Sequence, residues 1–246
     1  MTKWKPRSRD LFRFAQCAAM TLSIQACTTP SQVFQNPSPG PLVFGSEGPL
    51  LTYLVMGDST AAGQGAAYAD GIAMGTTATL AKARHVAMTN LSVSGARVSD
   101  VFRDQLPAAQ QLHPDLVLLS VSANDVTHLT SIASMKVNFL RIVRGLKAAN
   151  PRVAIVVTGS PDMGAPPRIP RLFRGLASRR TEAVNVMVQR LSEEEQLTFA
   201  PIAAATGPLF RRDLTLFGPD RFHPNARGYA TWIPVLNEAI ARAMGR

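Results

Sequence analysis

Apolar runs alternate with amphipathic stretches from residue 50 to the end of the chain. Uninterrupted Val, Leu and Ile predict buried strands, here over residues 50–56, 88–93, 115–121, 153–158 and 197–201. Between them we expect helices, one ending near residue 84 and others over 98–110, 131–149, 181–195 and 225–244. Strands that alternate with helices are typical of a parallel sheet covered on both faces. The pattern predicts an α/β fold, a three-layer α/β/α sandwich with about five parallel strands.

The first 27 residues have a different character. Five basic residues precede an apolar segment over residues 14–24, and Ile24-Gln25-Ala26-Cys27 follows it. This order predicts a secretory signal peptide, and its tail resembles a bacterial lipobox in which Cys27 is lipidated. An amphipathic helix or a simple membrane anchor is the alternative, although the apolar segment is short for a membrane span. We expect an exported lipoprotein of the cell envelope, with periplasmic or secreted export as the alternative.

Residues 28–48 are rich in Pro, Ser and Gly and show no apolar period, which predicts a tether. One domain over residues 49–246 is then expected. The chain has two cysteines, Cys17 and Cys27, and both precede this domain. A cysteine nucleophile and an internal disulfide are therefore excluded within it.

The formal net charge is +10, but the basic residues are spread out and are not interleaved with stacking aromatics. This distribution argues against nucleic-acid binding. One arginine cluster could face an anionic substrate or a lipid head group, or could be a solvated helix face: Arg168, Arg171, Arg174, Arg179 and Arg180. The irregular segment 160–174 follows the fourth predicted strand, and we expect it to shape a substrate pocket.

The first predicted strand ends at Gly57-Asp58-Ser59. The carboxyl end of a parallel strand is where open α/β sheets place their sites, so Ser59 is a candidate nucleophile. Asp58 and Ser59 are also favoured at helix starts, so this turn could be only a helix cap.

A candidate base lies near the end of the chain, where Asp220 and His223 are three residues apart. A histidine can take a serine proton at neutral pH, and a carboxylate on its other nitrogen fixes the tautomer. Acyl transfer also needs donors for the oxyanion. The N–H groups of Ser59 and Gly95 and the side-chain amide of Asn124 follow the first three predicted strands and could supply them.

These four stretches resemble the four signature blocks of the SGNH hydrolase superfamily, the GDSL esterases and lipases. Gly57-Asp58-Ser59 matches the nucleophile block, Gly95 the glycine block, Asn124-Asp125 the Asn-Asp block, and Asp220-x-x-His223 the acid-base block. The resemblance implies a flavodoxin-like sheet and hydrolysis of esters or thioesters without a metal or other cofactor. In two departures from the family pattern, Thr60 replaces Leu and Ser122 stands where glycine is usual.

The first hypothesis is a serine esterase with Ser59, His223 and Asp220 as its triad, acting on a small-molecule, lipid or glycan ester. A metal-dependent hydrolase is a second, with four candidate ligands: Asp58, Asp125, His128 and His223. A third is a non-catalytic envelope lipoprotein that binds an acyl or glycan ligand in the same cleft. Nucleotide binding is disfavoured, because residues 57–65 lack the Lys-Ser/Thr of a phosphate loop.

Overall fold

The structure is a computed structural model, and it describes residues 40–45 and 47–245. The predicted signal peptide, Cys27 and residues 28–39 of the predicted tether lie outside the described residues. Among the residues described, no helix is long and apolar enough to cross a membrane.

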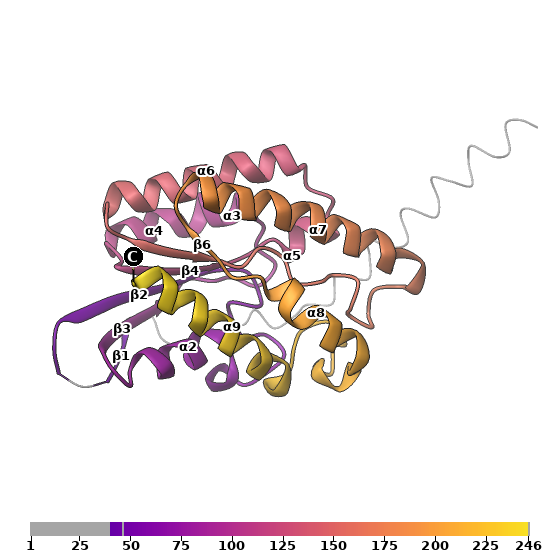
Figure 1. Ribbon diagram of the computed structural model, residues 1–246, viewed down its shortest axis with the longest axis horizontal. Helices are drawn as coiled ribbons and strands as arrows, with labels where there is room; N and C mark the ends of the chain where they lie inside the picture. The colour runs from indigo at the N-terminus through magenta and orange to yellow at the C-terminus, as the bar shows by residue number, and fades with distance from the viewer. Residues whose placement is uncertain (1–39, 46, 246) are drawn as a thin grey trace, which may run out of the picture. The chain divides into compact units, whose positions relative to one another are not determined.

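A six-stranded sheet forms the middle layer (Figure 1). Its strands are β1 (Leu42–Phe44), β2 (Leu50–Gly57), β3 (His85–Asn90), β4 (Leu116–Ser120), β5 (Ala154–Val157) and β6 (Thr198–Phe199), in the order β1-β3-β2-β4-β5-β6. Strands β2 to β6 are parallel, which confirms the predicted sheet. Their order matches the flavodoxin-like arrangement, in which strand order reverses next to the first strand.

The strand β1 is antiparallel, with Leu42 opposite Met88 and Phe44 opposite Val86. It lies inside the segment predicted as a tether, so the prediction that residues 28–48 stay outside the folded domain is wrong at residues 42–44. Three apolar residues between prolines and glycines are too few to show a period. They form a strand because the edge of β3 offers unpaired backbone groups.

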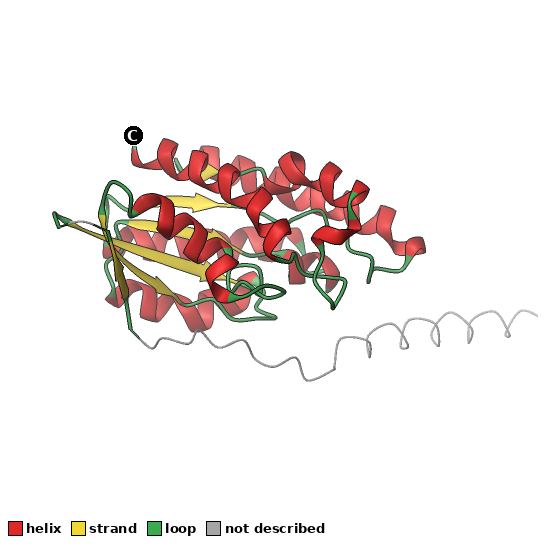
Figure 2. Ribbon diagram, turned by 90° about the horizontal axis from the view of Figure 1, so that it is seen from below, coloured by secondary structure: helices red, strands yellow, loops and turns green. Residues whose placement is uncertain are grey.

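Helices cover both faces of the sheet, and Figure 2 shows the strands between the two helical layers. One layer packs its apolar side chains on one face and consists of α3 (Val98–Asp100), the π-turn Val101–Gln105, α4 (Leu106–Gln111), α6 (Ile132–Ala149) and α7 (Arg171–Glu194). The other layer consists of α2 (Ile72–Leu80), α8 (Ile202–Arg212) and α9 (Ala226–Met244). The three-layer sandwich is thereby confirmed.

Some element boundaries differ from the prediction. The helix α7 begins ten residues before the predicted start at 181, and α8 was not predicted. The first helix is shorter than expected, because Gly63 and Gly65 have φ of 80° and 98° and the chain turns there before α2 begins. The strand β3 ends at Asn90, three residues before the predicted end.

The strands β2 and β4 lie side by side and end together, with Gly57 opposite Ser120. Gly57 has a φ of 142°, and a Cβ atom there would lie 1.8 Å from the Ser120 carbonyl oxygen. Only glycine fits this close approach. The segment after β2 and the short helix α5 (Ala123–Thr127) after β4 therefore start from the same edge of the sheet.

Candidate active site

Ser59 lies at the turn directly after β2, and the turn is closed by its own backbone. The N–H of Asp58 donates to the Ser120 carbonyl oxygen at 3.0 Å, and the carbonyl oxygen of Ser59 accepts the N–H of Gln64 at 2.9 Å. Ser59 is 5% exposed. The turn therefore holds the hydroxyl in a nearly water-free position at the carboxyl edge of the sheet.

The structure brings Ser59, His223 and Asp220 into one chain of hydrogen bonds. The Nε2 atom of His223 lies 2.9 Å from Ser59 Oγ, and its Nδ1 atom lies 2.5 Å from Asp220 Oδ2. The other carboxylate oxygen of Asp220 accepts the backbone N–H groups of Phe222 and His223, each at 3.0 Å. One tight loop therefore presents both the carboxylate and the imidazole.

The same bonds keep Asp220 ionised. Its partial burial acts to raise its pKa, but the hydrogen bonds from the His223 ring and from the N–H groups of His223 and Phe222 outweigh burial and lower the pKa from 3.8 to about 2. A carboxylate that is charged at neutral pH orients the imidazole and stabilises its protonated form.

Packing fixes the ring of His223, which is 7% exposed. The Phe222 ring lies edge-on to it at 5.0 Å between centroids. On the other side, a Cβ atom at Gly65 would lie 2.8 Å from His223 Cβ and 2.4 Å from the Pro224 carbonyl oxygen. Gly65 therefore lets the turn after Ser59 press against the histidine loop.

Asp58 is buried directly beneath the nucleophile. Its Oδ1 atom accepts the backbone N–H of Thr60 at 2.9 Å and the Thr60 hydroxyl at 2.8 Å. Burial raises the pKa of Asp58 in spite of these bonds. Thr60, the departure from the GDSL pattern, thus takes part in closing the turn.

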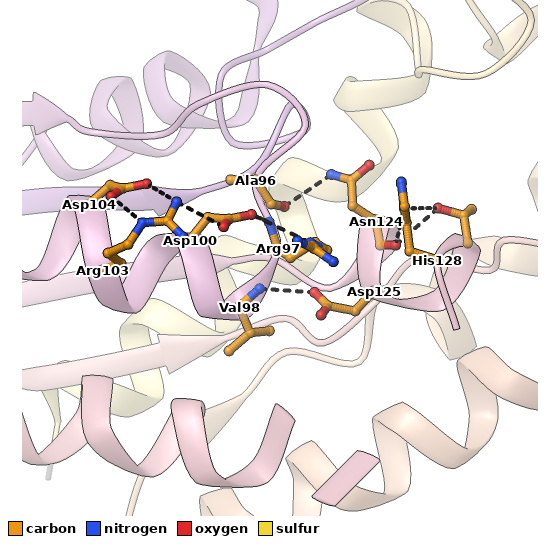
Figure 3. Close-up of polar contacts among 10 residues, drawn as sticks. Ala96, Arg97, Val98, Asp100, Arg103, Asp104, Asn124, Asp125 and His128 are labelled. Atoms are coloured by element: carbon orange, nitrogen blue, oxygen red, sulfur yellow. Dashed lines mark hydrogen bonds and ion pairs between the residues drawn. The ribbon is translucent and has the colours of Figure 1, made fainter. Parts of the chain in front are cut away.

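The segment after β3 and the helix α5 after β4 contact each other through two hydrogen bonds (Figure 3). The side-chain amide of Asn124 donates to the Ala96 carbonyl oxygen at 3.1 Å, and buried Asp125 accepts the Val98 N–H at 3.0 Å. Asn124 is therefore held against the residue that follows Gly95. Within the part of the chain that the structure describes, the N–H groups of Ser59 and Gly95 have no hydrogen-bond acceptor.

Ser122 adopts a conformation that suits glycine. Its φ is 116°, it is fully buried, and its hydroxyl contacts the Val121 carbonyl oxygen. The usual glycine at this position is explained by this left-handed backbone, which a side chain strains. Ser122 nevertheless leads directly into α5, which carries Asn124.

The four residues proposed as metal ligands are not assembled. Asp58 bonds to Thr60, Asp125 to Val98, and exposed His128 to the Asn124 carbonyl oxygen at 2.8 Å. Across residues 40–45 and 47–245, no three His, Cys, Asp or Glu side chains are grouped so that they could hold a metal ion. Elsewhere, His85 and His113 contact the carbonyl oxygens of Gly48 and Ala149.

A largely apolar pocket adjoins Ser59 and His223. The segment predicted to shape a pocket contributes five residues to its wall: Pro161, Asp162, Met163, Ala165 and Pro166. The sequence did not predict five further lining residues, because nothing in the pattern around them differs from that of ordinary core residues. They are Thr206, Gly207 and Phe210 of α8, Phe217, and Trp232 of α9.

Comparison with known proteins identifies the family of this chain. The family model of the GDSL-like lipase/acylhydrolases matches residues 55–231. GDSL-like esterase Rv1075c from Mycobacterium tuberculosis is 28% identical over 198 residues, which are 78% of this chain but 62% of the relative. The chain thus spans less than two thirds of the length of that relative.

Solved structures agree on the fold. The crystal structure of TesA superposes with a TM-score of 0.65 at 19% identity, over 78% of this chain and 99% of TesA. The lipase Lip_vut3 from a goat rumen metagenome gives a TM-score of 0.65 at 18% identity, over 77% and 97% of the two chains. The match of the family model confirms the predicted family resemblance, and this chain belongs to the GDSL-like lipase/acylhydrolase family.

Proposed function

We propose that this protein is a serine esterase in which Ser59 is the nucleophile, His223 the general base and acid, and Asp220 the residue that orients His223. The observation that carries the proposal is the unbroken chain of hydrogen bonds from Ser59 Oγ through the imidazole to Asp220. This geometry lets a proton leave the serine as its oxygen attacks.

In the acylation step, Ser59 Oγ attacks the carbonyl carbon of the ester while its proton passes to His223 Nε2. Asp220, charged at neutral pH, stabilises the imidazolium through Nδ1. The bond from the carbonyl carbon to the leaving oxygen then breaks, and His223 gives its proton to the departing alcohol. Ser59 is left carrying the acyl group.

Deacylation repeats these steps with water. His223 removes a proton from a water molecule, whose oxygen attacks the acyl carbon. The bond to Ser59 Oγ breaks, the hydroxyl regains its proton from His223, and the carboxylic acid leaves. A thioester would follow the same path, with a thiol as its first leaving group.

Both steps place negative charge on the former carbonyl oxygen. We assign its stabilisation to the N–H groups of Ser59 and Gly95 and to the amide of Asn124. Two observations support this role: both backbone donors lack an acceptor among the described residues, and Asn124 is anchored to the loop that carries Gly95. Donors held in place before the reaction lower the barrier most effectively.

The lining of the pocket indicates where the acyl part of the substrate binds. Phe210, Phe217 and Trp232 give it an apolar lining next to the nucleophile. We propose that it holds the acyl chain of a lipid ester or other hydrophobic ester, while the alcohol or sugar part extends toward solvent.

Hydrolysis of p-nitrophenyl esters from acetate to palmitate tests this function, with the full chain and its Ser59→Ala variant assayed with and without EDTA. We expect turnover that Ser59→Ala abolishes and EDTA leaves unchanged. A folded wild type without activity on any ester contradicts the proposal and favours the ligand-binding lipoprotein. Inhibition by EDTA would instead favour metal-dependent hydrolysis.

We also propose that the protein is exported and anchored to the cell envelope through a lipid on Cys27. The basic head, the apolar segment and the Ile-Gln-Ala-Cys order support this assignment. Labelled palmitate fed to expressing bacteria should be incorporated into the wild type and not into Cys27→Ser. Equal labelling of the two, or none in either, contradicts the anchor.

A further inference from the structure

The first turns of α7 expose large apolar side chains. Leu172 is 85% exposed, Leu176 57% and Phe173 47%. Figure 1 shows that this end of α7 continues past the strands and projects from the body of the domain. These side chains therefore cover no part of the core, and water contacts them directly.

The same segment is strongly basic. Residues 163–181 contain five arginines and no Asp or Glu. Arg174 is committed to the fold, since it donates to the carbonyl oxygens of Ile169 and Pro167 at 2.9 and 3.1 Å, and Arg180 contacts the Thr130 carbonyl oxygen. Arg171 and Arg179 are exposed, and among the described residues neither has an ion-pair or hydrogen-bond partner.

Helical spacing puts Leu172, Phe173, Leu176 and Arg179 on one face, and Arg171 precedes them as the first residue of the helix. Leu172 and Leu176 are four residues apart, Phe173 and Leu176 three, and Arg179 follows Leu176 by three, so they are neighbours on the helix surface. Apolar side chains flanked by arginines are the composition of helices that lie in the interface of anionic membranes. The arginines attract the lipid phosphates, and the apolar side chains enter the acyl boundary.

The loop that leads into α7 lines the pocket. Pro166 lines the pocket, and the next residues lead directly into α7. The Arg168 guanidinium lies 5.7 Å from the centroid of Phe222, which also lines the pocket. Leu129, 58% exposed, directly precedes Thr130, the residue that Arg180 contacts.

We propose that Leu172, Phe173 and Leu176, together with Arg171 and Arg179, form a lipid-contact surface that binds anionic phospholipid bilayers. A second copy of the chain fits less well, because a two-fold contact would set the same unpaired arginines against each other. A projecting helix end also offers no groove for a peptide. This surface is distinct from any anchor at Cys27, and the proposal does not depend on catalysis.

Binding of the full chain to vesicles tests the lipid-contact surface. Vesicles of phosphatidylcholine alone are compared with an equal mixture of phosphatidylcholine and phosphatidylglycerol. We expect tighter binding to the mixed vesicles, with slower hydrogen exchange of the amides of residues 171–180. Hydrogen exchange reports on residues 171–180 alone, so it distinguishes contact of this segment with the vesicles from vesicle binding by the amino-terminal segment.

Two variants separate the contributions. The pair Arg171→Gln and Arg179→Gln should weaken partition to mixed vesicles about 30-fold, which corresponds to about 1 kcal/mol for each arginine. The triple change Leu172→Ser, Phe173→Ser and Leu176→Ser should remove the protection from exchange. Matched controls are Arg190→Gln and Val186→Ser, exposed residues of the same helix nearer its other end.

Unchanged exchange of residues 171–180 in the presence of mixed vesicles overturns the proposal. So does equal weakening by the control variants. A concentration-dependent dimer that the triple variant dissociates, without any vesicle effect on this segment, assigns the surface to self-association instead. Thermal unfolding of each variant shows whether the fold is retained, which we expect because all the changed side chains are exposed.

Discussion

The Nε2 atom of His223 lies 2.9 Å from the Oγ atom of Ser59, although 164 positions separate the two residues. The turn after β2 places the serine, and the loop before α9 places the histidine. A second contact holds the two segments together, because the Tyr229 hydroxyl of α9 donates to the Gln64 carbonyl oxygen at 2.7 Å. The catalytic spacing therefore depends on the docking of the last helix as well as on local turns.

Replacement of Asp220 by Asn should lower kcat/KM for esters about 10³- to 10⁴-fold, because the amide can no longer fix the imidazole tautomer or stabilise its charge. The fold should persist, since the amide oxygen still accepts the N–H groups of Phe222 and His223. Asp213→Asn is the matched control, as Asp213 closes a similar turn by accepting the Thr215 N–H at 2.9 Å. Equal activity of both variants would remove Asp220 from the triad.

Asp220 should also make the stability of the fold depend on acid pH. Its folded-state pKa of about 2 is below its ordinary value of 3.8, so ionised Asp220 stabilises the fold above that value, and this stabilisation is lost as the pH falls through about 2. The free energy of unfolding in urea, measured from neutral pH downward, should differ between wild type and Asp220→Asn, and the difference should shrink toward pH 2. A constant difference would contradict the low pKa.

Substitution of Asn124 by Ala should reduce kcat about 10²- to 10³-fold with little change in KM, because the donor acts mainly in the transition state. Loss of the bond to Ala96 should cost about 1 kcal/mol of stability. Thr127→Ala, on the same short helix, removes a hydroxyl that donates to the Asn124 carbonyl oxygen at 3.1 Å and serves as the control. An unaltered kcat of Asn124→Ala in steady-state kinetics would exclude Asn124 from the oxyanion hole.

Replacement of Ser122 by Gly should stabilise the fold by about 1 kcal/mol, since glycine adopts a φ of 116° without strain. Ser122→Ala separates the two possible causes, because it removes the buried hydroxyl and keeps the Cβ atom. Urea unfolding should show a gain for Gly and a smaller one for Ala. If Ala stabilises as much as Gly, the hydroxyl and not the backbone is responsible.

A larger side chain at Gly207 should shorten the acyl chain that the pocket accepts. Gly207 lines the pocket, and a Cβ atom there would lie 3.1 Å from Asp162 Cβ, so a valine crowds the loop after β5 and disturbs this part of the pocket wall. Gly207→Val should retain acetate turnover and lose long-chain turnover. Gly175→Val is the control, because Gly175 lies in α7 with nothing within 4 Å of its added Cβ. An equal loss of activity toward esters of all chain lengths would contradict the placement of the acyl group in this pocket.

Much of the site could be predicted because its residues follow strand ends. Continuous apolar runs mark β2 and β4, and the residues just after them, Ser59 and Asn124, meet at one edge since parallel strands share a direction. The wall contributed by α8 could not be predicted. Thr206, Gly207 and Phe210 line the pocket only because α8 packs against α9 and the loop at Asp162, and these contacts between distant segments leave no periodic pattern.

The start of α7 was missed for a related reason. Leu172, Phe173 and Leu176 point to solvent, so the usual core-facing period is absent over its first turns. The strand β1 was missed because its pairing depends on β3, a partner more than 40 residues away. A periodic pattern of apolar residues arises when one face of an element is buried against the core. The start of α7 and the strand β1 lack such a buried face, so their sequences show no period.

The antiparallel direction of β1 decides at which end of the sheet this strand begins. Leu42 pairs with Met88, closer to the catalytic end of β3 than Phe44 with its partner Val86, so β1 itself begins on the side that carries Ser59. The helix α9 starts beside His223 and runs away from it, and Figure 1 marks the carboxyl terminus far from α5. Purification tags and immobilising linkers should therefore be joined at the carboxyl terminus, where they leave substrate access open.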